Sequence, residues 1–199
     1  MNFLFLGDSY TIGEAVKEKE KWPAQLIKAL EKQKLKVASS TIIAKTGWTT
    51  DELDSAIATA HLNSTYDLVT LCIGVNNQYR GRSVENYTVE FEELLKQAII
   101  YAGNDASRVL VVSIPDYGVT PFAKEKKPEK ISSEIDEFNR INLQIARRYN
   151  AGYVEITTIS KLAKKDLSLL AEDQLHPSAK MYSRWVDTMM PLVKTILEP

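Results

Sequence analysis

The chain has 199 residues, of which 44% are hydrophobic and 26% are charged, and its formal net charge is −1. This length suits a single domain over residues 1–199 that buries roughly 70% of its unfolded surface. The near-zero net charge gives no electrostatic basis for a nucleic-acid partner. No apolar run approaches the ~20 residues of a membrane span. Composition therefore indicates an ordinary globular protein, and it leaves the oligomeric state open.

The few cysteines and histidines limit redox and metal chemistry. Cys72 is the single cysteine, so the chain cannot form an internal disulfide. Because Cys72 lies inside an apolar run, we expect a buried, inert thiol. His61 and His176 are the two histidines, and with one cysteine they cannot build a histidine/cysteine zinc site. We expect no metal and no organic cofactor.

The start of the chain bears on its localisation. Strand-like sequence begins by Phe3, so no signal peptide fits ahead of it. If Met1 is the native start, we expect a cytoplasmic protein, whereas a chain trimmed at this end would fit an exported one. The lysine-rich stretches 17–21 and 124–127 are interleaved with glutamate, which is typical of solvated charged faces.

Apolar strands alternate with amphipathic helices along the chain. The expected strands are residues 3–6, 37–44, 68–73, 109–114 and 153–156. The expected helices are residues 22–32, 51–61, 84–102, 131–149 and 177–197. This alternation predicts an α/β fold with about five parallel strands covered on both faces.

Local signals mark the ends of several of these elements. Pro23 suits the first turn of its helix, and Thr49, Thr50 or Asp51 is available as the cap of the next one. Pro191 is expected to kink the last helix. The one long irregular stretch, residues 116–130, is expected to be a surface loop or a rim beside the site.

A serine follows the first expected strand. Gly7, Asp8 and Ser9 come directly after the apolar run 3–6, so Ser9 lies where that strand ends. In open α/β sheets, ligands bind beyond the carboxyl ends of the strands. A nucleophilic serine there needs a base and a group that orients the base.

His176 is the better candidate for that base. A surface position near a helix C-terminus explains His61 without any catalytic role. His176 follows Asp173 by three residues and precedes Pro177, which favours extended backbone at residue 176 and is expected to open the last helix. Asp173 can then accept a hydrogen bond from one ring nitrogen while the other faces Ser9. The alternative is that Asp173 and His176 merely cap that helix.

Oxyanion donors are expected at other strand ends. Gly47 follows the second strand and Asn76 follows the third. A glycine lets a backbone N–H approach a ligand closely, and an asparagine amide is a neutral donor. For an isolated glycine or asparagine, a position in a turn is the more usual explanation.

Four blocks in this order resemble the GDSL/SGNH hydrolase family. They are Gly7-Asp8-Ser9, Gly47, Gly74-Val75-Asn76-Asn77 and Asp173-Gln174-Leu175-His176. The resemblance implies a flavodoxin-like, three-layer α/β/α fold and a serine ester hydrolase. It also implies a catalytic triad of Ser9, His176 and Asp173 and an oxyanion hole formed by Ser9, Gly47 and Asn76. One position departs from the family pattern, because Asn77 stands where an aspartate is usual, which affects local hydrogen bonding more than the reaction.

The sequence defines the substrate only coarsely. Residues near the strand ends that are expected to line the substrate site are Tyr10, Trp48, Tyr79, Arg80 and Phe122, and plain packing is the alternative for each. Since no long lid insertion is visible, we expect a small-molecule partner, a short-chain acyl or acetyl ester. The alternatives are a lysophospholipase or thioesterase acting on longer acyl chains, a non-catalytic SGNH-like binding domain, and a flavodoxin-like nucleotide or regulatory module.

Overall fold

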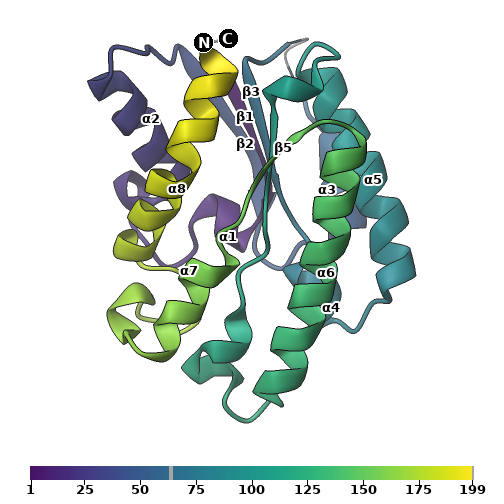
Figure 1. The fold of residues 1–199 in the computed structure, drawn as a ribbon, viewed down its shortest axis with the longest axis vertical. Coiled ribbons are helices and arrows are strands. Elements are labelled where there is room, and N and C mark those ends of the chain that lie inside the picture. Colours follow the sequence, from purple (N-terminus) through teal and green to yellow (C-terminus); the bar gives the residue numbers. More distant parts are fainter. Residues whose placement is uncertain (63–64, 199) are drawn as a thin grey trace.

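A five-stranded sheet lies at the centre of the computed structural model, which describes residues 1–62 and 65–198 (Figure 1). The strands are β1 (Asn2–Asp8), β2 (Ser39–Lys45), β3 (Leu68–Cys72), β4 (Val109–Val112) and β5 (Gly152–Val154). They lie in the order β2-β1-β3-β4-β5, and every neighbouring pair is parallel. The predicted parallel α/β fold is confirmed.

Helices cover both faces of this sheet (Figure 1). The long ones are α2 (Trp22–Lys32), α3 (Thr50–Thr59), α5 (Val84–Tyr101), α6 (Pro128–Arg148) and α8 (Ala179–Leu197). Helices α2 and α8 pack together on one face, and α3, α5 and α6 lie on the other. Both chain ends lie at the amino edge of the sheet (Figure 1), so the carboxyl edge is left to the loops that follow the strands.

The two central strands show why the strand prediction succeeded. Strand β3 is buried along its whole length, and β1 is buried from Phe3 onward. A strand buried on both faces reads as a continuous apolar run rather than an alternating one. The register pairs Phe3 with Leu68 and Gly7 with Cys72, so β1 and β3 end together at the carboxyl edge.

Three short helices were not expected from the sequence. They are α1 (Ser9–Ile12), α4 (Val75–Tyr79) and α7 (Thr157–Lys161). Four or five residues are too few to show a helical period, so turn-like sequence hides them. The stretch 116–130 likewise holds two 3-10 turns and the start of α6, not one irregular loop.

The last helix differs from its prediction at the start. Pro177 does not open it: Ser178 is the N-cap, with its hydroxyl accepting from the Met181 N–H, and α8 begins at Ala179. Pro177 instead pairs with Leu170 in an isolated antiparallel bridge. Pro191 lies inside α8, and the helix continues past it to Leu197.

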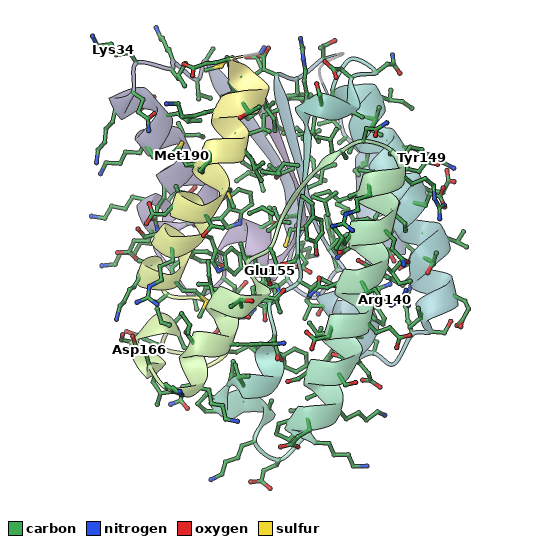
Figure 2. All side chains as sticks on the ribbon, in the orientation of Figure 1. Lys34, Arg140, Tyr149, Glu155, Asp166 and Met190 are labelled. Atoms are coloured by element: carbon green, nitrogen blue, oxygen red, sulfur yellow. The ribbon has the colours of Figure 1, made fainter. Side chains whose placement is uncertain are left out.

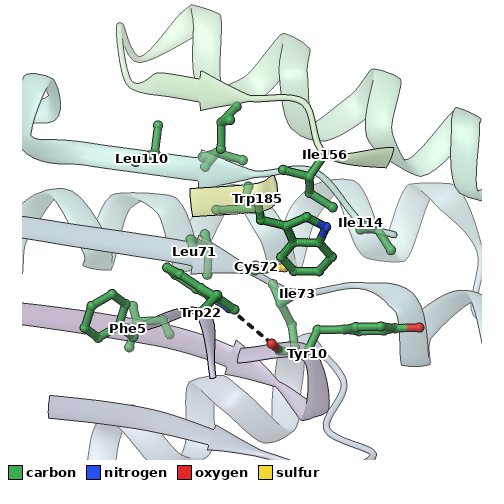
Figure 3. Packing of buried hydrophobic residues seen from close by; sticks show 14 of the residues in the cluster. Phe5, Tyr10, Trp22, Leu71, Cys72, Ile73, Leu110, Ile114, Ile156 and Trp185 are labelled. Atoms are coloured by element: carbon green, nitrogen blue, oxygen red, sulfur yellow. Dashed lines mark hydrogen bonds between the residues drawn. The ribbon is translucent and has the colours of Figure 1, made fainter. Parts of the chain in front are cut away.

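Trp22 ties the core to the turn that carries Ser9 (Figure 3). Its ring packs edge-on against Phe5, with the centroids 5.2 Å apart. Its Nε1 donates to the Tyr10 carbonyl oxygen at 3.1 Å, and the Tyr182 hydroxyl donates to the same oxygen at 3.1 Å. The α1 turn is therefore held by both α2 and α8. Cys72 is buried nearby, and burial raises the pKa of its thiol, as an inert thiol requires.

Charged side chains cover the outer faces of the helices, as for the exposed Arg140 of α6, and Lys34 in the turn after α2 is exposed as well (Figure 2). Within residues 1–62 and 65–198, no helix combines the length and the apolar character needed to cross a bilayer.

Candidate active site

Ser9 lies at the carboxyl end of β1, as the first residue of α1. The Asp8 carboxylate caps this turn by accepting the Tyr10 N–H at 3.0 Å. A Cβ on Gly7 would overlap the Thr11 hydroxyl and lie 2.5 Å from the Cys72 carbonyl oxygen. Glycine is therefore required before Asp8 because the turn folds back onto β3 with no space for a side chain. The motif places Ser9, a residue that is 4% exposed, at the edge of the sheet.

The structure brings Ser9, His176 and Asp173 into one hydrogen-bonded chain. His176 Nε2 lies 3.0 Å from Ser9 Oγ, although the two residues are 167 positions apart. His176 Nδ1 lies 2.6 Å from Asp173 Oδ2. The predicted triad residues therefore have the geometry that a serine nucleophile, its base and the base's orienter require.

Asp173 is fixed by the turn it belongs to. Its Oδ1 accepts the backbone N–H groups of Leu175 and His176, each at 3.0 Å. Burial raises the pKa of Asp173, but hydrogen bonds from the His176 ring and these two N–H groups outweigh it and hold the pKa below its ordinary value. Ser178 caps α8, so Asp173 and His176 are not the cap of that helix. His61 is exposed beyond the end of α3, as a surface histidine would be.

The loop after β2 is held by side chains from the α4 segment. Gly47 has φ +84°, a conformation that favours glycine. Its carbonyl oxygen accepts from Arg80 Nη2 at 2.6 Å, and the Trp48 carbonyl oxygen accepts from Asn76 Nδ2 at 2.9 Å. Because an amide nitrogen carries two hydrogens, this bond uses only one of the Asn76 donors. Two successive carbonyls are thus tied in place beside the serine's strand.

A cavity of about 160 Å³ opens beside Ser9 and His176. Its walls are mostly aromatic and aliphatic, and include the expected Tyr10, Asn76, Tyr79 and Phe122 together with Val75, Tyr117 and Leu175. Sequence reasoning missed the last three. Val75 and Leu175 are neighbours of motif residues, and Tyr117 comes just after the fourth strand, so its position beyond a strand end was a usable signal.

Two residues expected to line the substrate site serve the loop after β2 instead. Arg80 bonds the Gly47 carbonyl oxygen and forms an ion pair with Glu52 at 3.2 Å. Trp48 offers its backbone carbonyl to Asn76. Neither lines the cavity beside Ser9: the Arg80 side chain is held by the Gly47 carbonyl and Glu52, and the Trp48 side chain packs against the hydrophobic core.

Asn77, the departure from the usual aspartate, is fully buried. Its Oδ1 accepts the Thr50 N–H at 3.1 Å, and its Nδ2 donates to Thr50 Oγ1 at 2.6 Å. The Thr50 hydroxyl in turn donates to the Glu90 carboxylate. The amide both donates and accepts here, so Asn77 joins α4 to the start of α3 without adding a buried charge.

The capping carboxyl of Asp8 is 1% exposed, and burial raises its pKa to about 7 although the Tyr10 N–H bond lowers it. The folded protein therefore binds this proton more tightly than the unfolded chain does. Between pH 3.8, the ordinary pKa of an aspartate, and about pH 7, the contribution of this group to stability falls as pH rises, because the unfolded chain ionises first.

We expect Asp8→Asn to abolish this loss of stability at rising pH while keeping an acceptor for the Tyr10 N–H. Thermal unfolding of both proteins from pH 5 to pH 8 measures the effect. The difference in Tm, variant minus wild type, should increase as pH rises to about 7 and level off above that pH. A Tm difference that stays constant over this range would contradict the buried, raised carboxyl.

A three-layer α/β/α sandwich with a Ser–His–Asp chain at the carboxyl edge of its sheet has the architecture of the flavodoxin-like serine hydrolases. The model of the GDSL-like lipase/acylhydrolase family matches residues 5–184. The chain therefore belongs to this family and is a carboxylic ester hydrolase.

Solved structures support the same fold. The lipase/acylhydrolase from Enterococcus faecalis has a TM-score of 0.75 at 19% identity, over 100% of this chain and 97% of that one. The acetyl xylan esterase Axe2-W215I from Geobacillus stearothermophilus has 0.74 at 18% identity, over 96% and 94%. The esterase EstA from Pseudoalteromonas sp. has 0.70 at 20% identity, over 100% and 99%. No curated protein sequence matches the chain.

Proposed function

We propose that the chain hydrolyses short-chain acyl or acetyl esters through a Ser9–His176–Asp173 triad and an acyl-enzyme. The observation that carries this proposal is the continuous chain of contacts from Asp173 Oδ2 through the imidazole to Ser9 Oγ, at 2.6 Å and 3.0 Å. Family membership supports ester hydrolysis in general. The geometry supports the assignment of roles to these residues.

The proposed mechanism has two halves. Ser9 Oγ attacks the ester carbonyl while His176 Nε2 takes its proton, and Asp173 stabilises the resulting imidazolium. The N–H groups of Ser9 and Gly47 and the Asn76 amide hold the oxyanion. His176 then gives the proton to the leaving alcohol, and water, activated by the same histidine, releases the acyl group.

The size of the cavity favours a short acyl chain. Its volume of about 160 Å³ is below the ~300–1,000 Å³ of typical ligand pockets. Its walls are apolar apart from the reacting groups, which suits an alkyl chain. The structure of Axe2 described as an acetyl xylan esterase shares the fold, which supports including acetylated sugars in the test.

An acyl-length series separates this proposal from the long-chain alternatives. We expect kcat/KM for p-nitrophenyl esters to be highest from acetyl to butyryl and to fall at least about tenfold by octanoyl, because the longer chain cannot enter the cavity. Acetylated xylo-oligosaccharides are assayed beside them. A kcat/KM that rises with chain length would favour the lysophospholipase or thioesterase reading.

Covalent labelling separates an active hydrolase from a silent binding domain. A fluorophosphonate reacts with an activated serine, and we expect mass spectrometry to find one adduct, on Ser9. Labelling should disappear in Ser9→Ala and persist in Ser183→Ala, which alters an exposed serine of α8. EstA was solved inhibited by monoethylphosphonate. A wild-type protein that takes no label would contradict the proposed nucleophile.

Arg80 is expected to act on the oxyanion hole through Gly47. Arg80→Ala frees the Gly47 carbonyl, and displacing a positioned donor by about 1 Å can cost up to about 100-fold. We expect kcat for p-nitrophenyl acetate to fall about ten- to hundredfold with little change in KM or Tm, and added guanidinium to restore part of it. Arg82→Ala is the matched control, because Arg82 pairs with Asp51 and not with the loop. Equal losses in both variants would contradict this role.

A further inference from the structure

A second cavity adjoins the one beside Ser9. It measures about 400 Å³, and its walls include Tyr79, Tyr117, Lys126, Lys127, Lys130 and Glu134. Tyr79 and Tyr117 also line the cavity beside Ser9. The two cavities therefore adjoin at these two rings, which form a wall of each. We call the second one the lysine cleft.

The lysine cleft carries an excess of positive charge. Its one carboxylate, on Glu134, accepts from Gln78 Nε2 at 2.8 Å and lies 3.4 Å from Lys130 Nζ. Within the part of the chain that the structure describes, Lys126 and Lys127 form no ion pair. Two ammonium groups are thus left without a counter-charge at this edge of the site.

Aromatic rings position one of these ammonium groups. Lys126 Nζ lies 4.8 Å from the centroid of the Phe122 ring and 5.5 Å from that of Tyr79. A cation held over a ring face gains from the ring's quadrupole. Phe122 and Tyr79 are also walls of the cavity beside Ser9, and both are partly exposed, at 38% and 51%. The positive charge of Lys126 therefore lies against two walls of the cavity beside Ser9.

We propose that the lysine cleft binds an anionic group, a phosphate or a carboxylate, on the alcohol portion of the ester. This inference rests on the proposed function, since it places the acyl group in the small apolar cavity and the carbonyl at Ser9. The alcohol portion then passes over Tyr79 toward Lys126 and Lys127. Exposed ion pairs are weak one at a time, so two lysines acting together give selectivity rather than tight binding.

The test compares two substrates that differ only in the anion. It measures kcat/KM for 1-acetylglycerol 3-phosphate and for 1-acetylglycerol at low ionic strength. We expect the phosphate ester to be preferred about five- to tenfold, from up to about fivefold for each exposed pair. The ratio of kcat/KM for the phosphate ester to kcat/KM for the neutral ester should fall toward one as salt is added, because added ions screen exposed charges.

The variants assign this preference to the cleft. Lys126→Gln/Lys127→Gln should bring the ratio of the two kcat/KM values close to one. Lys124→Gln removes a lysine from the same segment that does not line the cleft, so it should keep most of the preference. An acetyl ester of a hydroxycarboxylic acid is the third substrate. Preference for either anion supports the proposal and tells phosphate from carboxylate.

Several results would overturn the proposal. They are a wild-type ratio near one, a double variant that keeps the ratio, and a Lys124→Gln variant that loses as much of the ratio as the double variant does. Failure of the proposed function has a separate signature, because Ser9→Ala would then still hydrolyse neutral 1-acetylglycerol. The ratio of the two kcat/KM values and the dependence of hydrolysis on Ser9 are thus independent readouts.

Discussion

Ser9→Ala is expected to lower kcat for p-nitrophenyl acetate by roughly 10⁴–10⁶. The variant removes the hydroxyl oxygen that lies 3.0 Å from His176 Nε2 and is proposed to attack the carbonyl. Its residual activity should come from the oxyanion donors and from binding, which survive loss of the nucleophile. Initial rates measured with enough protein to detect the variant above spontaneous hydrolysis give the ratio.

The fold should tolerate this change. The turn at Ser9 is held by the Asp8 cap and by the bonds of Trp22 and Tyr182 to the Tyr10 carbonyl, none of which uses the serine hydroxyl. The Tm of Ser9→Ala should therefore stay near that of the wild type. Ser183→Ala, an exposed change on α8, should keep full activity. Activity of Ser9→Ala within tenfold of the wild type would reject Ser9 as the nucleophile.

The sequence was informative about the sheet for a physical reason. Strands buried on both faces must be apolar throughout, so β1, β3 and β4 are visible as apolar runs. The edge strand β2 is half exposed, and its predicted bounds are correspondingly shifted. Helices of four or five residues, such as α1 and α4, carry no period and could not be predicted.

The candidate site could be predicted where a residue's chemistry is its signal. A serine at a strand end and an Asp–His pair near a proline are weak signals when taken alone. Their order along the chain with Gly47 and Asn76, which resembles the GDSL pattern, is what connects residues 167 positions apart. Arg80 was expected to line the substrate site because it comes shortly after the end of the third strand. Its actual partner is a backbone carbonyl, and no side-chain pattern in a sequence reveals such a contact. Lys126 and Lys127 were likewise predicted to lie on a solvated charged face, because the sequence does not show that they line a cavity together with Tyr79 and Tyr117.

The hydrogen bonds of Asp173 determine how an asparagine side chain would be oriented at this position. Oδ1 is held by two backbone N–H groups, so it must remain an acceptor, and only Oδ2 faces His176 Nδ1. In Asp173→Asn the amide oxygen must therefore take the Oδ1 place, and the NH₂ group must face the imidazole. Because that group donates, Nδ1 becomes an acceptor and the ring proton moves to Nε2.

Asp173→Asn is accordingly expected to lower kcat by about 10⁴, since an Nε2–H cannot accept the Ser9 proton. Nitrogen NMR of the imidazole should show the proton on Nε2 in the variant and on Nδ1 in the wild type at neutral pH. Asp166→Asn is the control, because Asp166 also caps a short turn but pairs with Lys180, away from Ser9. It should stay within a few-fold of the wild type. An Asp173→Asn that keeps its activity would mean that His176 is oriented without Asp173, and the Ser–His–Asp triad would have to be abandoned.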